Sequence, residues 1–429
     1  MISPARKVAF QLLCRIELQG AFSDYVTNSP AVAQLERLDR NLATELVYGT
    51  LRWQGFLDYI LTRACSRRWE RVDPKARILL RMSLYQMHHM DRIPDHALVN
   101  DAVNVAKAEL PRGAAGFVNG VLRQLARSRP WQSEVFMSEC PAWAAVSLPE
   151  WLWDRWAARF GSTAARQFAL SLNEPPLNTI YLNSDRDVSS DVSSKLIPSG
   201  IVPGAYAWKG DRGDLQTKAL RFQDEASQLI PHLLGDVTGW RIWDVCAAPG
   251  GKSAILRDLC GHSGIVVSSD LRMGRVARLS RFLELSSGRA VVLVMDAAQP
   301  PPFRIAFDAV LADAPCSGLG TLRRNPEIKW RIDPERLESL QESQISILSS
   351  AASAVRPGGF LVYATCSTEP EENEQVIQRF LAAHPNFRSV RPEHPRGVES
   401  WLDCNSFVKT FPSERLWDGF FAGLMLRDS

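Results

Sequence analysis

Two cysteines stand just after segments with the pattern of β-strands. Cys316 follows the strand-like run 307–313, and Cys366 directly follows the run 360–365. In a doubly wound sheet, neighbouring strands lie about 4.8 Å apart, and ligands bind beyond the carboxyl ends of the strands. A cysteine in this position is often inert filler. Because there are two, we expect both thiols to reach one site, where they could perform nucleophilic and acid–base chemistry.

A glycine-rich turn joins an earlier strand, 242–246, to a helix. Small residues let the backbone approach a ligand closely, and the helix N-terminus offers free N–H groups to it. A phosphate-binding P-loop would need glycine at the first position of this turn, and no G-x-G-x-x-G follows the strand, so neither an NTPase nor a dinucleotide site is expected. The residues of the turn are Cys246, Ala247, Ala248, Pro249, Gly250, Gly251 and Lys252.

Three acids close successive strand-like segments. Asp270 ends the run 264–270, about 20 residues beyond the glycine turn, where an acid binds the ribose hydroxyls of an adenosine cofactor. Asp296 ends the next strand and could receive the adenine amino group, and Asp313 ends the one after it. Each acid alone could be a helix cap. Together, at consecutive strand ends, they favour an adenosine-containing ligand.

A parallel sheet is needed to bring these residues together. From about residue 240, strand-like segments alternate with helical patterns, of which the clearest covers 337–355 and stops at Arg356-Pro-Gly-Gly359. Such alternation predicts right-handed crossovers and helices on both faces of the sheet. The fold class expected for this part is therefore α/β, doubly wound and Rossmann-like.

The first 130 residues have a helical apolar pattern and a basic charge. They contain 19 Lys and Arg against 12 Asp and Glu, whereas the remainder contains 31 against 35. This asymmetry indicates a polyanion held by the first region and modified by the second, although a solvated basic surface would look the same. Arg123, Arg127 and Arg129 could contact phosphates. Prolines at 130, 141 and 149 indicate a linker, and residues 175–210 suggest a small α+β segment.

Composition limits the class of protein further. The chain has 429 residues, of which 45% are hydrophobic and 23% charged, as in ordinary globular proteins. It shows neither an apolar run of membrane-spanning length nor an export signal, and its eight cysteines include no C-x-x-C pair. We therefore expect a cytoplasmic monomer with reduced thiols, no metal and no membrane contact.

Three segments together resemble a known family. D-x-C-A-A-P-G-G-K, D-A-P-C-S-G and T-C-S resemble the RNA cytosine-C5 methyltransferases that use S-adenosylmethionine, from about Phe222 to Ala422. The segment 117–123 looks like part of a NusB-type helical RNA-binding domain, a pairing similar to the bacterial 16S rRNA methyltransferases of the Sun or Fmu type. The resemblance implies an all-α NusB-like domain at 1–135, an RRM-like α+β domain at 145–222 and a class I methyltransferase domain at 223–429.

The resemblance also implies roles for the candidate residues. Cys366 would attack C6 of a cytosine, and Cys316 would help to remove the C5 proton. Asp313 would hydrogen-bond the cytosine edge near the methyl donor, while the turn 246–252 and the other two acids would hold S-adenosylmethionine. We infer in addition that Lys252 favours the thiolate form of the nucleophile.

The expected substrate is an unpaired loop cytosine of 16S rRNA, because a stacked base cannot present C6 to a thiolate. The basic and aromatic segment 323–330 is expected near this RNA, although a solvated loop would have the same content. Two alternatives stay open: the same chemistry on tRNA or another rRNA, and a non-catalytic RNA-binding assembly or antitermination factor. The presence of the turn, the acids and both cysteines argues against the second alternative.

Overall fold

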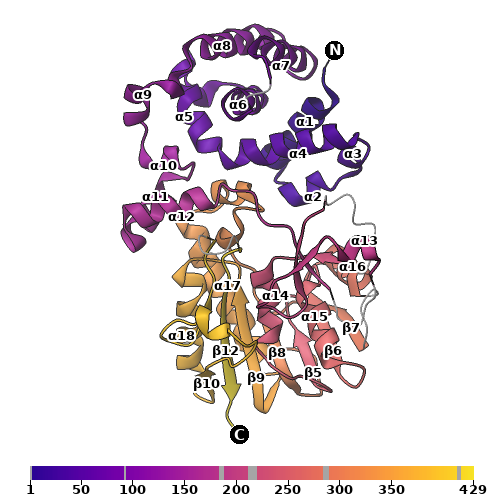
Figure 1. Ribbon diagram of the computed structural model, residues 1–429. Helices are drawn as coiled ribbons and strands as arrows, with labels where there is room; N and C mark the ends of the chain where they lie inside the picture. Colours follow the sequence, from indigo (N-terminus) through magenta and orange to yellow (C-terminus); the bar gives the residue numbers. More distant parts are fainter. Residues whose placement is uncertain (1, 91–92, 183–187, 211–219, 284–288, 413–416) are drawn as a thin grey trace. The chain divides into compact units, whose positions relative to one another are not determined.

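A computed structural model gives the structure of the chain (Figure 1). It describes residues 2–90, 93–182, 188–210, 220–283, 289–412 and 417–429. The chain forms two compact units. The first comprises Met1–Pro175 and Leu322–Arg331, and the second comprises Pro176–Thr321 and Ile332–Ser429. The sequence suggests three domains, whereas the structure divides the chain into two compact units. The division into three domains stays a prediction.

The described residues of the first unit form helices joined by loops. Their boundaries reflect local signals: Asp73, for example, accepts a hydrogen bond from the Ala76 N–H at 3.0 Å just before the helix that starts at Pro74. The helices are α1 (Pro4–Gln19), α2 (Ser23–Thr27), α3 (Pro30–Ala33), α4 (Arg37–Arg52), α5 (Gln54–Ala64), η1 (Trp69–Arg71), α6 (Pro74–His89), α7 (Asp95–Glu109), α8 (Ala114–Ser128), η2 (Pro130–Gln132), α9 (Glu134–Ser138), α10 (Ala142–Ala145), α11 (Glu150–Phe160), α12 (Ser162–Ser171) and η5 (Pro326–Trp330).

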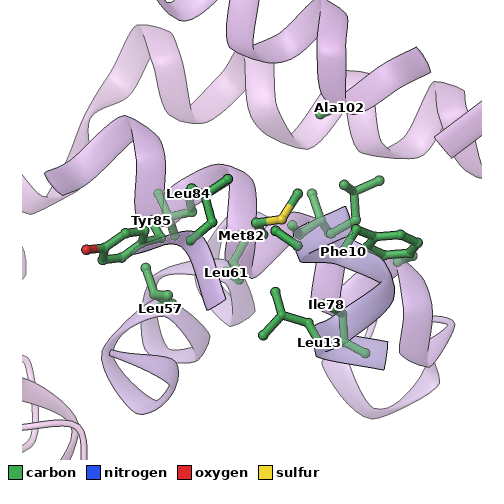
Figure 2. Close-up of a cluster of buried hydrophobic side chains, with 14 of the residues drawn as sticks. Phe10, Leu13, Leu57, Leu61, Ile78, Met82, Leu84, Tyr85 and Ala102 are labelled. Atoms are coloured by element: carbon green, nitrogen blue, oxygen red, sulfur yellow. The ribbon is translucent and has the colours of Figure 1, made fainter. Parts of the chain in front are cut away.

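Helix α6 is at the core of this unit. It is buried on all sides from Ile78 to Met87, and Figure 2 shows its side chains packed among those of α1, α5 and α7. The one cation in this stretch, Arg81, is neutralised by Asp58 and Glu17, with N–O distances of 2.6 and 2.5 Å. Burial by itself would lower the pKa of Arg81, but these ion pairs raise it. The helical pattern that the sequence predicts for the first 130 residues is confirmed.

The second unit contains the strands. They are β1 (Thr179–Tyr181), β2 (Leu196–Pro198), β3 (Ala205–Trp208), β4 (Arg221–Phe222), β5 (Arg241–Asp244), β6 (Ile265–Asp270), β7 (Arg289–Val294), β8 (Phe307–Asp313), β9 (Val355–Thr365), β10 (Phe387–Val390), β11 (Val408–Lys409) and β12 (Phe421–Arg427). Its helices are α13 (Ser190–Ser193), α14 (Glu225–His232), α15 (Gly251–Cys260), α16 (Met273–Leu283), η4 (Leu319–Thr321), α17 (Pro334–Ala352), η6 (Pro370–Glu372), α18 (Glu374–Ala383) and η7 (Val398–Trp401).

Among the described residues, the large sheet has eight strands in the order β10-β12-β9-β8-β5-β6-β7, with β11 paired to β12 (Figure 1). Along β5, Ile242 enters one hydrophobic core with α14 and α15, and the next residue, Trp243, enters a second core with α17 and α18. Because successive side chains of a strand point to opposite faces, this alternation shows that helices cover both faces. The doubly wound α/β fold expected from the sequence is confirmed.

Two features of this sheet differ from the sequence-based expectation. The last strand, β12, runs antiparallel to both β9 and β10. In addition, Arg356-Pro-Gly-Gly359, which we expected only to end a helix, lies inside β9 as an irregularity. Val355 pairs with Phe307, and pairing resumes with Phe360 opposite Ala309. Gly358 has a φ of +67°, a conformation that glycine adopts without strain.

A small antiparallel sheet with the order β2-β3-β1-β4 precedes the large one. Strand β1 lies within the α+β segment suggested for residues 175–210. Parts of the expected α+β domain 145–222, residues 183–187 and 211–219, lie outside the described residues. Within the described part of the chain, no helix is long and apolar enough to cross a membrane.

Candidate active site

The two cysteines of interest meet at the carboxyl edge of the large sheet. Strands β8 and β9 are parallel neighbours, with Asp313 opposite Ala364. Cys316 follows the end of β8 by three residues, and Cys366 directly follows β9. Their Sγ atoms lie 3.2 Å apart, and both thiols are free and partly exposed. The hydrogen bond between the two thiols and the burial of the site raise the pKa of the Cys316 thiol.

A buried carboxylate that the sequence analysis missed joins the two cysteine loops. Glu372 accepts hydrogen bonds from the N–H and Oγ of Ser317, at 2.7 and 2.5 Å, and from the Oγ of Ser367, at 2.5 Å. Gln344 Nε2 donates a fourth hydrogen bond at 3.0 Å. Ser317 and Ser367 are the residues that directly follow the two cysteines. The acidic run Glu371-Glu372-Asn373-Glu374, so soon after T-C-S, was the available signal.

The turn that carries Cys366 is held from its other side by Asn373. Thr365 Oγ1 donates to Asn373 Oδ1 at 2.5 Å, and Asn373 Nδ2 donates to the Ser367 carbonyl at 3.0 Å. Asn373 therefore bonds to the residues before and after the cysteine. Since side-chain hydrogen bonds of this kind replace the ladder that ends with the strand, the turn is ordered where the sheet stops.

The glycine turn lies between β5 and α15, as the sequence predicts. Gly250 has a φ of +116°, and a Cβ atom there would lie 2.8 Å from Leu279 Cδ1. A Cβ on Gly251 would lie 2.6 Å from the side-chain oxygen of Gln223. Helix α15 begins at Gly251, so its first N–H groups face this turn without intrahelical acceptors. Burial raises the pKa of Cys246, as expected for a thiol that packs rather than reacts.

The strand-end acids differ in their surroundings. Asp270 closes β6, is 3% exposed and accepts from the Arg272 N–H at 3.2 Å. Arg275, another residue that the sequence analysis missed, lies 3.4 Å from Asp270 and donates to the Ala248 carbonyl at 2.8 Å. It thus ties the acid to the glycine turn. Asp296 lies two residues beyond β7, is exposed and accepts from the Ala298 N–H at 3.0 Å, which is the pattern of a turn cap.

Lys252 and Asp313 form an ion pair, with Nζ and Oδ2 2.7 Å apart. The pair connects the start of α15 to the end of β8, two elements that flank the site. Lys252 Nζ also lies 5.0 Å from the ring centre of Phe420. Because the ammonium already has a carboxylate partner, the positive potential that we inferred for it from the sequence is largely compensated locally.

Asp244, the first residue of the motif, is fully buried at the end of β5. Ser253 Oγ donates to its Oδ2 at 2.5 Å, and Ser268 Oγ lies 3.0 Å from Ser253 Oγ. Burial raises the pKa of Asp244 to about 7. Its Oδ1 atom has no hydrogen-bond partner in the described part of the chain. The fully buried carboxylate does not itself face a ligand, but its negative charge beside the glycine turn suits a cofactor that carries positive charge.

The segment 323–330, expected near RNA, has several buried charged side chains. It belongs to the first unit, where Arg323, Glu327 and Lys329 are at most 3% exposed. Lys329 Nζ donates to the Arg52 carbonyl at 2.7 Å, and Glu327 accepts from the Ser23 N–H at 2.9 Å. These three charged side chains are therefore buried within the helical unit and do not face RNA, whereas the position of the segment near RNA stays a prediction.

The order of the strands, the glycine turn after β5 and the acid at the end of β6 define a class I methyltransferase fold. Among the described residues, no group of three or more His, Cys, Asp or Glu side chains could hold a metal ion. The chain resembles the crystal structure of PH0851, with a TM-score of 0.83 and 25% identity over 99% of each chain.

Sequence comparison identifies the family. Residues 232–426 match the family described as 16S rRNA methyltransferase RsmB/F, and residues 3–127 match the NusB family. The probable ribosomal RNA small subunit methyltransferase B of Bacillus subtilis is 32% identical over 97% of each protein. The ribosomal RNA small subunit methyltransferase B of Thermus thermophilus is 36% identical over 85% of each.

This chain belongs to the RsmB/F family of rRNA methyltransferases and carries a NusB-family region. It is therefore an S-adenosylmethionine-dependent methyltransferase, and RNA is its partner. The resemblance that the sequence motifs indicated is confirmed.

Proposed function

We propose that this chain transfers a methyl group from S-adenosylmethionine to C5 of one cytosine in 16S rRNA, through a covalent bond between Cys366 and C6 of the base. The observation that carries this proposal is the 3.2 Å approach of the Cys316 and Cys366 sulfurs at the carboxyl edge of the sheet. Two thiols at one point can serve one ring, the first as nucleophile and the second as base.

The nucleophilic step activates a ring that is otherwise unreactive at C5. The Cys366 thiolate adds to C6, a C6–S bond forms, and the electron pair of the C5–C6 double bond becomes available at C5. Asp313 hydrogen-bonds the cytosine edge and compensates the charge that develops on the ring. Covalent addition thus divides one difficult substitution into two easier steps.

The second step restores the aromatic ring. After methylation, C5 carries both a proton and a methyl group. Cys316, after it has released its own thiol proton to solvent, accepts that proton as a base, the C5–C6 double bond forms again, and the C6–S bond breaks to return the Cys366 thiolate. The two sulfurs are within hydrogen-bonding distance, so a proton can pass between Cys316 and Cys366.

Residues around the glycine turn are suited to hold the cofactor. S-adenosylmethionine, when bound, supplies a methyl group on a positively charged sulfur. The turn 246–252 provides backbone N–H groups, Asp270 the ribose ligand, and Asp296 a partner for the adenine amino group. Asp313 pairs with Lys252 of this turn and precedes Cys316 by three residues, and the buried Asp244 adds negative charge beside the turn.

The RNA must present an unpaired cytosine, at a cost of a few kcal/mol if the base has to leave a stack. We propose that the NusB-like region 1–135 and the segment 145–222 hold the surrounding rRNA loop, while residues 223–429 perform the chemistry. Arg123 and Arg127 are exposed on α8, whereas Arg129 pairs with Asp95 at 2.7 Å. We further propose that the protein acts as a monomer in the cytoplasm, where its rRNA substrate is made.

The test is methyl transfer by the purified full-length chain, with labelled S-adenosylmethionine and separate samples of 16S rRNA, other rRNA and tRNA. We expect one 5-methylcytosine in 16S rRNA. Cys366→Ala should abolish transfer and leave cofactor binding intact. Label in tRNA or another rRNA alone would assign the substrate differently, and no label in any RNA would favour a non-catalytic factor.

A further inference from the structure

Glu372 is a buried acid without a cationic partner. Its side chain is fully buried at the end of η6, and among the described residues no Lys or Arg pairs with it. Four donors surround it instead, from Ser317, Ser367 and Gln344. Burial raises the pKa of Glu372, and the hydrogen bonds from the two serines act in the opposite sense. Since an unpaired buried carboxylate is costly, this arrangement calls for an explanation beyond packing.

Three of the four hydrogen bonds divide between the two loops that carry the cysteines. Glu372 Oε1 accepts from the Ser317 backbone N–H, and Oε2 accepts from the Oγ atoms of both Ser317 and Ser367. The two hydroxyl oxygens lie 3.2 Å apart. Each serine is the next residue after a cysteine, so one carboxylate binds the loop of each sulfur.

Neighbouring groups hold the carboxylate itself. Gln344 Nε2 bridges Glu372 and the carbonyl of Pro315, the residue before Cys316, at 3.0 and 2.9 Å. The Tyr363 hydroxyl donates to the Glu372 carbonyl at 2.6 Å. Asn373, the next residue, closes the turn around Cys366. The acid is thus anchored to α17 and β9 before it contacts either cysteine loop.

Such an anchor matters because the strands end before the sulfurs. The ladder between β8 and β9 stops near Asp313 and Ala364, whereas the reacting atoms lie up to three residues farther on. A displacement of about 1 Å between reacting groups can cost about a hundredfold in rate. Two sulfurs that must act on adjacent carbons of one ring are especially sensitive to such a displacement.

We propose that Glu372 is a positioning residue that keeps the loops of Cys316 and Cys366 together, so that both sulfurs reach the same base. This inference rests on the proposed function for its catalytic consequence. Its structural part, the proximity of the sulfurs, can be measured without RNA or cofactor.

The experiment uses the full-length chain with Glu372→Ala, Glu372→Gln and a control, Glu374→Ala. Glu374 is a partly buried acid two residues away whose partner is Lys409, not a cysteine loop. Diamide accepts the two electrons and two protons that the thiols lose on oxidation, so the rate of the Cys316–Cys366 disulfide, followed by mass spectrometry, reports sulfur proximity. Methyl transfer, cofactor affinity and urea unfolding are measured on the same samples.

We expect Glu372→Ala to slow disulfide formation about tenfold and to lower kcat about a hundredfold, with KM for RNA and cofactor affinity within about threefold of wild type. Glutamine keeps one acceptor oxygen, and the serine hydroxyls can accept from its amide, so Glu372→Gln should recover most of both losses. Glu374→Ala should behave as wild type in both assays.

Unchanged disulfide and transfer rates in Glu372→Ala would overturn the proposal. Equal losses in Glu374→Ala would also overturn it, because they would show a general effect of removing an acid. If Glu372→Ala does not fold, Ser317→Ala and Ser367→Ala each remove part of the anchor and should each slow disulfide formation. A wild-type chain that methylates no RNA would refute the proposed function instead, while the disulfide rates would still decide the role of Glu372.

Discussion

Replacement of Asp244 by asparagine should make the cofactor-free chain more stable and yet weaken its binding of S-adenosylmethionine. The carboxyl group is fully buried, and burial raises its pKa to about 7 from the ordinary 3.8. The folded chain therefore binds this proton more tightly than the unfolded chain. The stability that the proton confers is complete below pH 3.8 and is lost as the pH rises to about 7.

The size of the effect follows from these two pKa values. Their difference corresponds to about 4 kcal/mol of unfolding free energy that the ionised group forfeits above pH 7. Asparagine cannot ionise and avoids this loss. Its amide N–H₂ group, however, is a donor that a carboxylate lacks, and a buried donor without an acceptor costs about 1–3 kcal/mol. We therefore expect Asp244→Asn to be about 1–3 kcal/mol more stable than wild type at pH 8.

Cofactor binding should change in the opposite direction. The ionised carboxylate is buried beside the glycine turn and attracts the positive charge of S-adenosylmethionine, so its loss should raise the Kd about tenfold, or about 1.4 kcal/mol. Urea unfolding at pH 5 and 8 and calorimetric titration at pH 8 measure the two effects.

Asp308→Asn is the matched control for this experiment. Asp308 is at the opposite end of β8, where it accepts from the Arg241 N–H at 2.8 Å and the Arg356 guanidinium at 2.7 Å. Its partial burial acts to raise its pKa, but these bonds lower it, so its replacement should destabilise the chain and leave binding unchanged. A less stable Asp244→Asn variant with unchanged affinity would refute the reasoning.

Three further predictions concern other sites. Cys316→Ala should accumulate a reduction-resistant RNA adduct of Cys366 on a denaturing gel, and an adduct in Cys366→Ala instead would reverse the two roles. Gly250→Ala should cost about 1–3 kcal/mol in urea unfolding, since its φ of +116° and the contact with Leu279 both oppose a side chain. Burial lowers the pKa of Lys329 to about 7 from 10.5, so the free energy of unfolding should increase as the pH rises from about 7 to 10.5. Lys329→Met should remove this increase.

Much of the catalytic region could be predicted from the sequence because its signals are local. The strands 307–313 and 265–270 show as apolar runs that end in acids, and the glycine turn shows as a run of small residues. Once the strand order of a doubly wound sheet is assumed, the meeting of Cys316 and Cys366 follows from chain geometry. The direction of β12 does not follow, because nothing in a short apolar strand specifies which way it pairs.

The residues that the sequence analysis missed act through contacts distant in the chain. Glu372 looks like a solvated acid in an acidic run, and only the folded chain brings Ser317, 55 residues away, to its carboxylate. Lys329 likewise looks like a surface cation, yet its partner is a carbonyl 277 residues away. A buried charge cannot be recognised in one sequence when its partners are backbone atoms, because every residue type supplies them.

The ten residues Leu322–Arg331 belong to the helical unit, although the chain on either side of them belongs to the catalytic unit. The polypeptide therefore passes between the units three times, and no single cut separates them. A fragment that begins after Pro175 would expose Arg323, Glu327 and Lys329, whose burial depends on the missing helices. Fusion or exchange of the NusB-like part therefore has to carry this decapeptide along with it.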